Sequence, residues 1–225
     1  MILTDRQIRE AHENGNIVIE PFDDAQVQGA TYDLRVGEYG ATTTTKRKVN
    51  IKNDGAITFS PGDFGIVTVL EELKLGNQYV GRFGLRSKYA RKGLIATTGP
   101  QIDPGFHGRL FIGITNLTPR SVSLPYKDDF ISVEFHKLEE PASKPYSGPY
   151  QDKLDLRPED LEAVLESEGM ALSEVMMLLR SLSANVSTMA QTLTGLTSEF
   201  KAFKWTVPII VTVGIAAIGI IVAIK

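Results

Sequence analysis

The residues best suited to chemistry lie near the middle of the chain, where Gln101 to Asn116 read QIDPGFHGRLFIGITN. The stretch begins with a carboxylate, Asp103, in front of a Pro-Gly turn. It continues into a strand-like run whose side chains could line a pocket. Turn chemistry alone offers a second interpretation of Asp103, as a cap for the turn, and Phe106 fits equally well as an ordinary core residue.

A second group of candidates is basic. Arg86, Ser87 and Arg91 lie in a short stretch that also contains Lys88 and Lys92. Cations and a hydroxyl donor at this spacing suit a triphosphate, because charge-assisted hydrogen bonds to phosphate are strong. A solvated basic loop explains the same charges.

Composition excludes several other kinds of site. The 225 residues include no cysteine, so the sequence offers no thiol nucleophile, thiolate metal site or disulfide. The histidines, His12, His107 and His136, have spacings that match no zinc pattern, and we predict no metal site built from protein side chains. A formal net charge of −3 argues against broad nucleic-acid binding, so we predict no nucleic-acid partner.

The elements that must position these groups are mostly short strands. After a helix that opens with a capping-box pattern at residues 4–7, strand-like runs alternate with turn formers up to about residue 150. Many short strands at regular intervals predict an all-β sandwich or barrel. The expected strands cover residues 17–20, 32–36, 57–60, 65–70, 79–85, 110–116, 121–124 and 131–136.

Five blocks in this region resemble, in order and spacing, the dCTP deaminase branch of the dUTPase superfamily. They read MILTDRQIREAHENGNIVIEPF, QGATYDLRVG, LRSKYARKGL, IDPGFHG and PYSGPYQ, and they span essentially all of residues 1–151. The resemblance implies a mainly β domain with a distorted jelly-roll fold over residues 1–151. It also implies a homotrimer with deoxynucleoside triphosphate sites where subunits meet.

The resemblance further implies roles for particular residues. Asp103 would be the catalytic residue, holding the sugar hydroxyl and orienting the attacking water, and Phe106 would pack against the deoxyribose. Asp33 matches a motif aspartate, although it could equally be structural and accept backbone hydrogen bonds. Mg²⁺ would arrive bound to the nucleotide phosphates. The implied substrate-binding residues are Arg86, Ser87, Arg91, Phe106, Tyr146 and Gln151.

One group that deamination needs is missing. Removing ammonia from cytosine requires a side chain that takes a proton from water and passes protons to the ring and the leaving group. The dCTP deaminases that this chain resembles carry a glutamate five residues after the last glycine of the Asp-Pro-Gly-x-x-Gly turn. Counting from Gly108 leads to Gly113, and Glu134 lies on another predicted strand. We therefore expect no deamination by this mechanism, and Gly113→Glu is the substitution expected to restore a trace of it.

Two functions from different classes remain. The first is a dUTP diphosphatase, in which Asp103 orients water towards the α-phosphorus and bound Mg²⁺ and the basic cluster stabilise the phosphates. The second is a catalytically silent trimer that senses nucleotide or has a structural role at a membrane. Deamination of dCTP ranks third because of Gly113.

A helical region follows the β domain. Residues 152–170 are predicted to be a linker with a short helix that begins near Pro158 and ends at Gly169. Over residues 171–204, apolar residues recur at alternating spacings of three and four, which predicts a coiled-coil stalk. A single amphipathic helix lying on the domain is the alternative. A trimeric head would impose threefold symmetry on the stalk.

The last segment is apolar. Residues 205–224 carry no charge, and as a helix they would span roughly 30 Å, the thickness of a bilayer's hydrocarbon core. Lys201, Lys204 and Trp205 resemble interfacial anchors, and Pro208 would fall in the first turn of the span. A buried core helix is the alternative. The sequence thus predicts a single-pass C-terminal membrane anchor, with the N-terminal domain in the cytoplasm.

Overall fold

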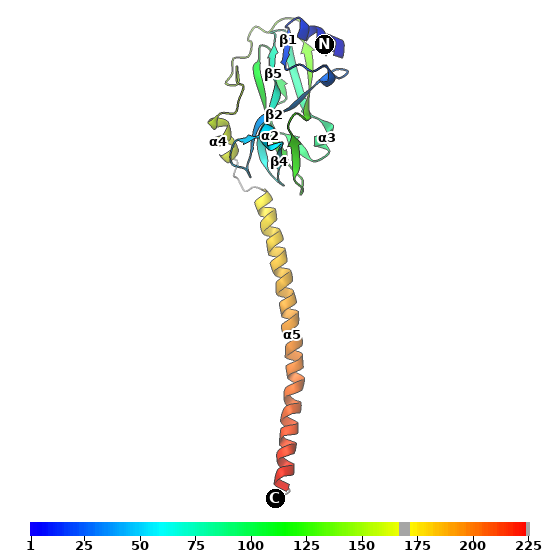
Figure 1. Ribbon diagram of the computed structural model, residues 1–225, viewed down its shortest axis with the longest axis vertical. Coiled ribbons are helices and arrows are strands. Elements are labelled where there is room, and N and C mark those ends of the chain that lie inside the picture. Colours follow the sequence, from blue (N-terminus) through cyan, green and yellow to red (C-terminus); the bar gives the residue numbers. More distant parts are fainter. Residues whose placement is uncertain (167–171, 224–225) are drawn as a thin grey trace. The chain divides into compact units, whose positions relative to one another are not determined.

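The computed structural model describes residues 1–166 and 172–223 (Figure 1). By its contacts the chain divides into two compact units, Met1–Ser173 and Glu174–Lys225. The helices are α1 (Asp5–Glu13), the 3-10 turn η1 (Asp24–Gln26), α2 (Ile51–Asp54), α3 (Ser87–Ala90), α4 (Pro158–Glu166) and α5 (Leu172–Ala223). The strands are β1 (Ile17–Glu20), β2 (Tyr32–Thr42), β3 (Val49–Asn50), β4 (Ala56–Phe59), β5 (Phe64–Leu75), β6 (Tyr79–Leu85), β7 (Leu94–Ala96), β8 (Gln101–Ile102), β9 (His107–Asn116), β10 (Val122–Pro125) and β11 (Asp129–Lys137).

The first unit is mainly β, as the strand pattern predicts. Within the described residues, nine strands form one curled antiparallel sheet in the order β7-β9-β5-β2-β11-β6-β8, with β1 added to β5 and β3 added to β2. Strands β10 and β4 pair separately. The buried side chains of the long strands form a single core, which includes Tyr32, Phe59, Phe130 and Phe135.

Strand β5 is the centre of the sheet because it pairs with β2, β9 and β1. Its register with β9 shifts between Thr68 and Glu72, where three residues of β5 lie opposite one of β9, and this shift is a β-bulge. Glu71 lies in the bulge, fully buried, and accepts hydrogen bonds from the Arg35 side chain at 2.6 Å and from the Arg35 backbone N–H at 2.9 Å. The ion pair thereby satisfies backbone and side-chain groups where the ladder is interrupted.

Gly37 allows β2 and β5 to approach closely at the same place. A Cβ atom on this residue would lie 2.5 Å from the carbonyl oxygen of Val69 and 2.7 Å from that of Thr68. Only glycine fits where two backbones come this close. The register between β2 and β5 shifts here as well, between Val36 and Gly40.

The elements that sequence patterns do not predict are short. Strands β3, β7 and β8 contain two or three residues each, too few to show a period. The run of threonines at residues 42–45 is half internal, since Thr42 and Thr43 are buried. The hydroxyls of Thr43 and Thr44 donate to buried Asp63 at 2.9 and 2.6 Å, which explains why polar residues occupy these positions.

The segment expected to be a linker contains the predicted short helix, α4, and its described part packs on the β domain. Leu156 and Val164 are buried, and the backbone N–H of Arg109 donates to the carbonyl of Lys153. The ammonium of Lys153 contacts the carboxylate of Asp160 at 2.6 Å, with exposures of only 7% and 10% for the two side chains.

The stalk and the predicted span belong to one helix, α5. Pro208 therefore lies inside a helix that begins at Leu172, and the expectation that it falls in a first turn is wrong. Over the part of the chain with described side chains, no helical stretch is both long and apolar enough to cross a bilayer. The predicted span, residues 205–224, extends beyond these residues, because the side chains of 217–225 and the backbone of 224–225 lie outside the described set.

We predict that Asp160→Asn lowers the free energy of unfolding of the β domain by about 3 kcal/mol, because it leaves the Lys153 ammonium buried without a counter-charge. Urea unfolding of the full-length chain, followed by circular dichroism, measures the change. Asp155→Asn is the matched control, since Asp155 pairs with Lys48 in a more exposed position and should contribute less than about 1 kcal/mol. Equal losses in the two variants would contradict the assignment.

Candidate functional site

The turn that carries Asp103 connects β8 to β9 and is closed by a hydrogen bond from the Phe106 N–H to the Asp103 carbonyl at 3.2 Å. Gly105 adopts a φ of +81°, and a Cβ atom there would lie 2.6 Å from Pro145, so the position requires glycine. The Asp103 side chain is exposed. Within the described residues its carboxylate has no hydrogen bond or ion pair with another side chain, so it is free to contact a ligand or a water molecule.

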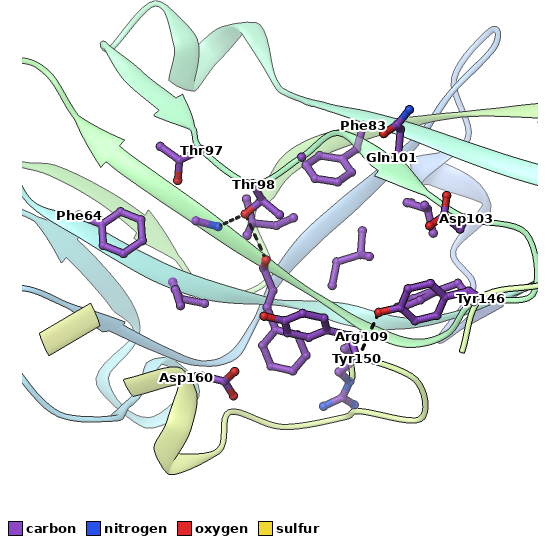
Figure 2. Close-up of a pocket in the computed structure, with 18 residues that line it drawn as sticks. Phe64, Phe83, Thr97, Thr98, Gln101, Asp103, Arg109, Tyr146, Tyr150 and Asp160 are labelled. Atoms are coloured by element: carbon purple, nitrogen blue, oxygen red, sulfur yellow. Dashed lines mark hydrogen bonds between the residues drawn. The ribbon is translucent and has the colours of Figure 1, made fainter. Parts of the chain in front are cut away.

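Asp103 lies at the rim of a pocket of about 330 Å³ (Figure 2). Phe106 and Tyr146 form one wall, with ring centroids 5.7 Å apart and an edge-to-face arrangement. Thr97, Thr98 and Phe64 lie towards the other end. An apolar pocket with a few polar groups at its rim is the usual form of a small-molecule site.

The C-terminal segment of the β domain holds the Asp103 turn in place. The Tyr146 N–H donates to the Pro104 carbonyl at 2.8 Å, and the Gln151 amide donates to the Gly105 carbonyl at 3.1 Å. Tyr146 lines the pocket, as its predicted role requires. Gln151 does not line it, and the structure shows it bracing the turn instead.

Gly113 is buried in β9, and neighbouring groups fill the space that a side chain would need. Its N–H donates to the Thr98 hydroxyl at 2.6 Å, and its carbonyl accepts from the Thr97 N–H at 2.8 Å. A Cβ atom at Gly113 would lie 2.5 Å from the Thr97 hydroxyl oxygen and 3.1 Å from that of Thr98. The pocket therefore has threonine hydroxyls, and no carboxylate, at the position where a deaminase would need its acid and base.

The basic cluster lies elsewhere in the same chain. Arg86 precedes α3 and forms ion pairs with buried Asp33 and with Asp129. Asp33 also accepts a hydrogen bond from the Ser132 hydroxyl, so its partners are side chains and not the expected backbone groups. The side chains of Ser87 and Arg91 are exposed, and none of the three residues Arg86, Ser87 and Arg91 lines the Asp103 pocket.

An acidic pair fixes the α3 turn beneath these exposed groups. Lys88 contacts Asp128 at 2.7 Å and Asp129 at 3.1 Å, and the Tyr89 hydroxyl donates to Asp128. Although burial opposes the effect, hydrogen bonds from Lys88 and Tyr89 lower the pKa of Asp128 below its ordinary value. The turn is thus held by a charged carboxylate, with Ser87 and Arg91 at its surface.

Several pocket residues were not predicted from the sequence. Arg109 and Asp160 line the pocket from the side opposite Asp103, and Tyr150 lies between them (Figure 2). The Nε atom of Arg109 is buried and has no hydrogen-bond partner among the described residues. Nothing in the local sequence marks Asp160, because its contact with the pocket depends on how α4 packs.

Comparisons with known proteins agree with this fold. A family model described as dCTP deaminase-like matches residues 2–138. The dCTP deaminase of Thermococcus sibiricus is 36% identical over 157 residues, which cover 70% of this chain and 96% of the relative. The "dCTP deaminase, dUMP-forming" of Methanothermobacter thermautotrophicus is 32% identical and covers 67% of this chain and 86% of the relative.

Among solved structures, the 2′-deoxycytidine 5′-triphosphate deaminase of Agrobacterium tumefaciens matches with a TM-score of 0.51 and 20% identity. The match covers 60% of this chain and 48% of the other, so this chain spans about half the length of that protein. This chain therefore shares its β fold with that protein. It belongs to the dCTP deaminase-like family, as the five sequence blocks predict.

The filled space around Gly113 changes the expectation for Gly113→Glu. We predict that this variant releases no ammonia from dCTP and is less stable by about 1 kcal/mol, because its Cβ atom displaces the Thr97 hydroxyl and disturbs the hydrogen bond between the Gly113 N–H and the Thr98 hydroxyl. The double variant with Thr97→Ala should recover part of the lost stability. Thermal unfolding and an ammonia assay measure both effects. Ammonia release by the unmodified chain would show that another group serves as acid and base.

Proposed function

We propose that this protein binds deoxynucleoside triphosphates and hydrolyses dUTP to dUMP and pyrophosphate. The observation that carries the proposal is the exposed Asp103 carboxylate, which has no side-chain partner among the described residues and lies beside the wall formed by Phe106 and Tyr146. The same pocket has no carboxylate at Gly113. Such a site has a group to orient water. It has none at Gly113 to protonate a cytosine ring.

The reaction needs little covalent chemistry from the protein. A water molecule held by Asp103 attacks the α-phosphorus, a P–O bond to the water forms, and the P–O bond to the β-phosphate breaks. Pyrophosphate leaves, and Asp103 accepts the proton of the water. Mg²⁺, carried in by the nucleotide, would neutralise part of the phosphate charge. Catalysis then rests on positioning and on stabilising charge as it develops.

The phosphate-binding groups would come from a second copy of the chain. Ser87 and Arg91 lie outside the Asp103 pocket of their own chain, although both are exposed on a turn that ion pairs hold in place. A homotrimer with sites between subunits brings the two halves together, and this arrangement supports the expected assembly. Arg86 would act mainly through Asp33 and Asp129, by holding the turn.

The activity in the name of one relative supports a hydrolytic role. The Methanothermobacter protein is described as a dUMP-forming dCTP deaminase, and forming dUMP from dCTP requires hydrolysis of the triphosphate as well as deamination. A chain of this family that lacks the deaminating group would retain the hydrolytic half of that reaction.

A catalytically silent nucleotide sensor is the second candidate. The observation that favours it is Arg86, whose guanidinium is already bound by two carboxylates and so contributes less positive charge to a phosphate. The two candidates share the pocket and differ only in turnover.

We also propose that the protein is held at a membrane by α5. Its described apolar side chains are exposed in the single chain, among them Leu182, Leu193, Phe200 and Phe203. Such exposure is expected of a coiled-coil helix considered without the other helices of the coiled coil. Residues 205–224 would then anchor the trimer, with the β domain in the cytoplasm.

We predict that Asp103→Asn slows release of pyrophosphate from dUTP with Mg²⁺ by on the order of a hundredfold, because the attacking water is no longer positioned. Arg91→Ala should also impair this release, because it weakens dUTP binding by roughly tenfold or more. Co-expression of the two variants should restore activity at about a quarter of the sites, because a mixed trimer contains sites with both residues intact.

Asp54→Asn, which changes an exposed carboxylate on α2, is the matched control and should leave pyrophosphate release unchanged. Failure of complementation would show that both residues act within one chain. Binding of dUTP without turnover by the unmodified chain would establish the silent sensor, and absence of binding to any deoxynucleotide would exclude both candidates.

For the anchor, we predict that the full-length chain floats with lipid vesicles at high salt, whereas the same chain ended after Lys204 stays in solution. Removing the apolar segment while keeping the stalk separates insertion from charge attraction. Light scattering in detergent should return a trimer for both chains. Flotation of the shortened chain, or a monomer in both cases, would contradict the proposal.

A further inference from the structure

His107 connects three parts of the β domain at the edge of the pocket. It is the first residue of β9, directly after Phe106. Its Nε2 atom lies 2.7 Å from a carboxylate oxygen of Glu72 in β5, and its Nδ1 atom lies 2.6 Å from a carboxylate oxygen of Asp152. The imidazole is therefore shared by the central strand of the sheet and the C-terminal segment.

Backbone contacts at the same residue join that segment to the Asp103 turn. The Asp152 N–H donates to the His107 carbonyl at 2.8 Å, and the His107 N–H donates to the Gln151 side chain at 3.2 Å. Asp152 has a left-handed φ of 56°, which a non-glycine residue rarely adopts without stabilising contacts. Residues 146–153 carry Tyr146 and Tyr150, both of which line the pocket.

Only the charged form of histidine satisfies both contacts. A neutral imidazole has one N–H donor, whereas the imidazolium has two and can donate to Glu72 and Asp152 together. In the strand register Glu20 of β1 lies opposite Glu72, and Lys74 of β5 lies opposite His107. The charges around the ring are therefore the carboxylates of Glu20, Glu72 and Asp152 and the ammonium of Lys74. This balance favours a positive charge on the ring.

We propose that His107 is a positioning residue which, as an imidazolium, clamps residues 146–153 onto the Asp103 turn and thereby sets the affinity of the pocket for a deoxynucleoside triphosphate. The clamp itself follows from the contacts described above. Its effect on affinity rests on the proposed function of the pocket.

The direction of the pH dependence follows from the contacts. The hydrogen bond to Asp152 raises the pKa of His107, burial opposes it, and the bond to Glu72 raises it further, so the folded value lies above the ordinary 6.5. The contribution of the clamp to stability is then fully present below pH 6.5, the ordinary pKa of histidine. It is lost as the pH rises through the higher pKa that His107 has in the folded protein. The segment should open as the pH rises through the raised pKa of His107.

Hydrogen exchange of the full-length chain in detergent tests the clamp directly. Protection of the backbone amides of Gln151 and Asp152, corrected for intrinsic exchange, should fall between about pH 6 and about pH 9. In His107→Gln the protection should be low throughout and independent of pH. Asp152→Asn removes one charge and should shift the midpoint of the wild-type transition to lower pH. His136→Gln is the matched control, because the His136 ring bonds to Glu134 at 3.0 Å and lies outside the segment.

Calorimetry with a non-hydrolysable imido analogue of dUTP then tests the effect of the clamp on nucleotide affinity. The affinity of the unmodified chain should weaken on the order of tenfold over the same pH range, and that of His107→Gln should not. Protection that ignores pH and survives His107→Gln would overturn the proposal. Loss of protection as expected, with no binding of the analogue at any pH, would leave the clamp standing and remove the nucleotide function instead.

Discussion

The buried ion pair between Glu71 and Arg35 stabilises the bend on which the rest of the domain depends. Burial raises the pKa of Glu71, and the hydrogen bonds from Arg35 oppose that rise and replace backbone bonds lost at the bulge. Beyond the bulge, β5 turns to meet β1 and the first residues of β9. A buried pair of this kind adds less stability than its geometry suggests, but removing one partner is costly.

The bend determines where the pocket forms. The second half of β5 receives the Asp103 turn through the hydrogen bond from the Leu75 N–H to the Phe106 carbonyl at 2.9 Å. The C-terminal segment covers the turn from the other side, and its buried contact between Lys153 and Asp160 makes it part of the domain. The pocket thus lies between an interrupted strand and a segment more than 70 residues away in the sequence.

Sequence patterns predict the parts of this structure that local chemistry determines. The first helix, the Asp103 turn and the absence of a carboxylate at Gly113 follow from periodicity or from a motif. The expected strands 32–36 and 65–70 locate β2 and β5 but stop well before the ends of these strands at Thr42 and Leu75. The bulge, the two-residue strands and the role of Gln151 could not be predicted, because they depend on contacts between distant segments. Pro208 was misplaced because the change from stalk to apolar segment, which the sequence does mark, is not a helix boundary, and α5 continues through both.

The threonines around Gly113 have an evolutionary consequence. A glycine codon such as GGA becomes a glutamate codon by one nucleotide change, so an acidic side chain at position 113 is genetically close. Here that side chain would enter space that the Thr97 hydroxyl already occupies. A change at Thr97 that removes this hydroxyl would relieve the contact, so the effect of a substitution at Gly113 depends on the residue at position 97. The two positions are therefore epistatic, and an acidic side chain at Gly113 is accepted more readily after a change at Thr97 than before it.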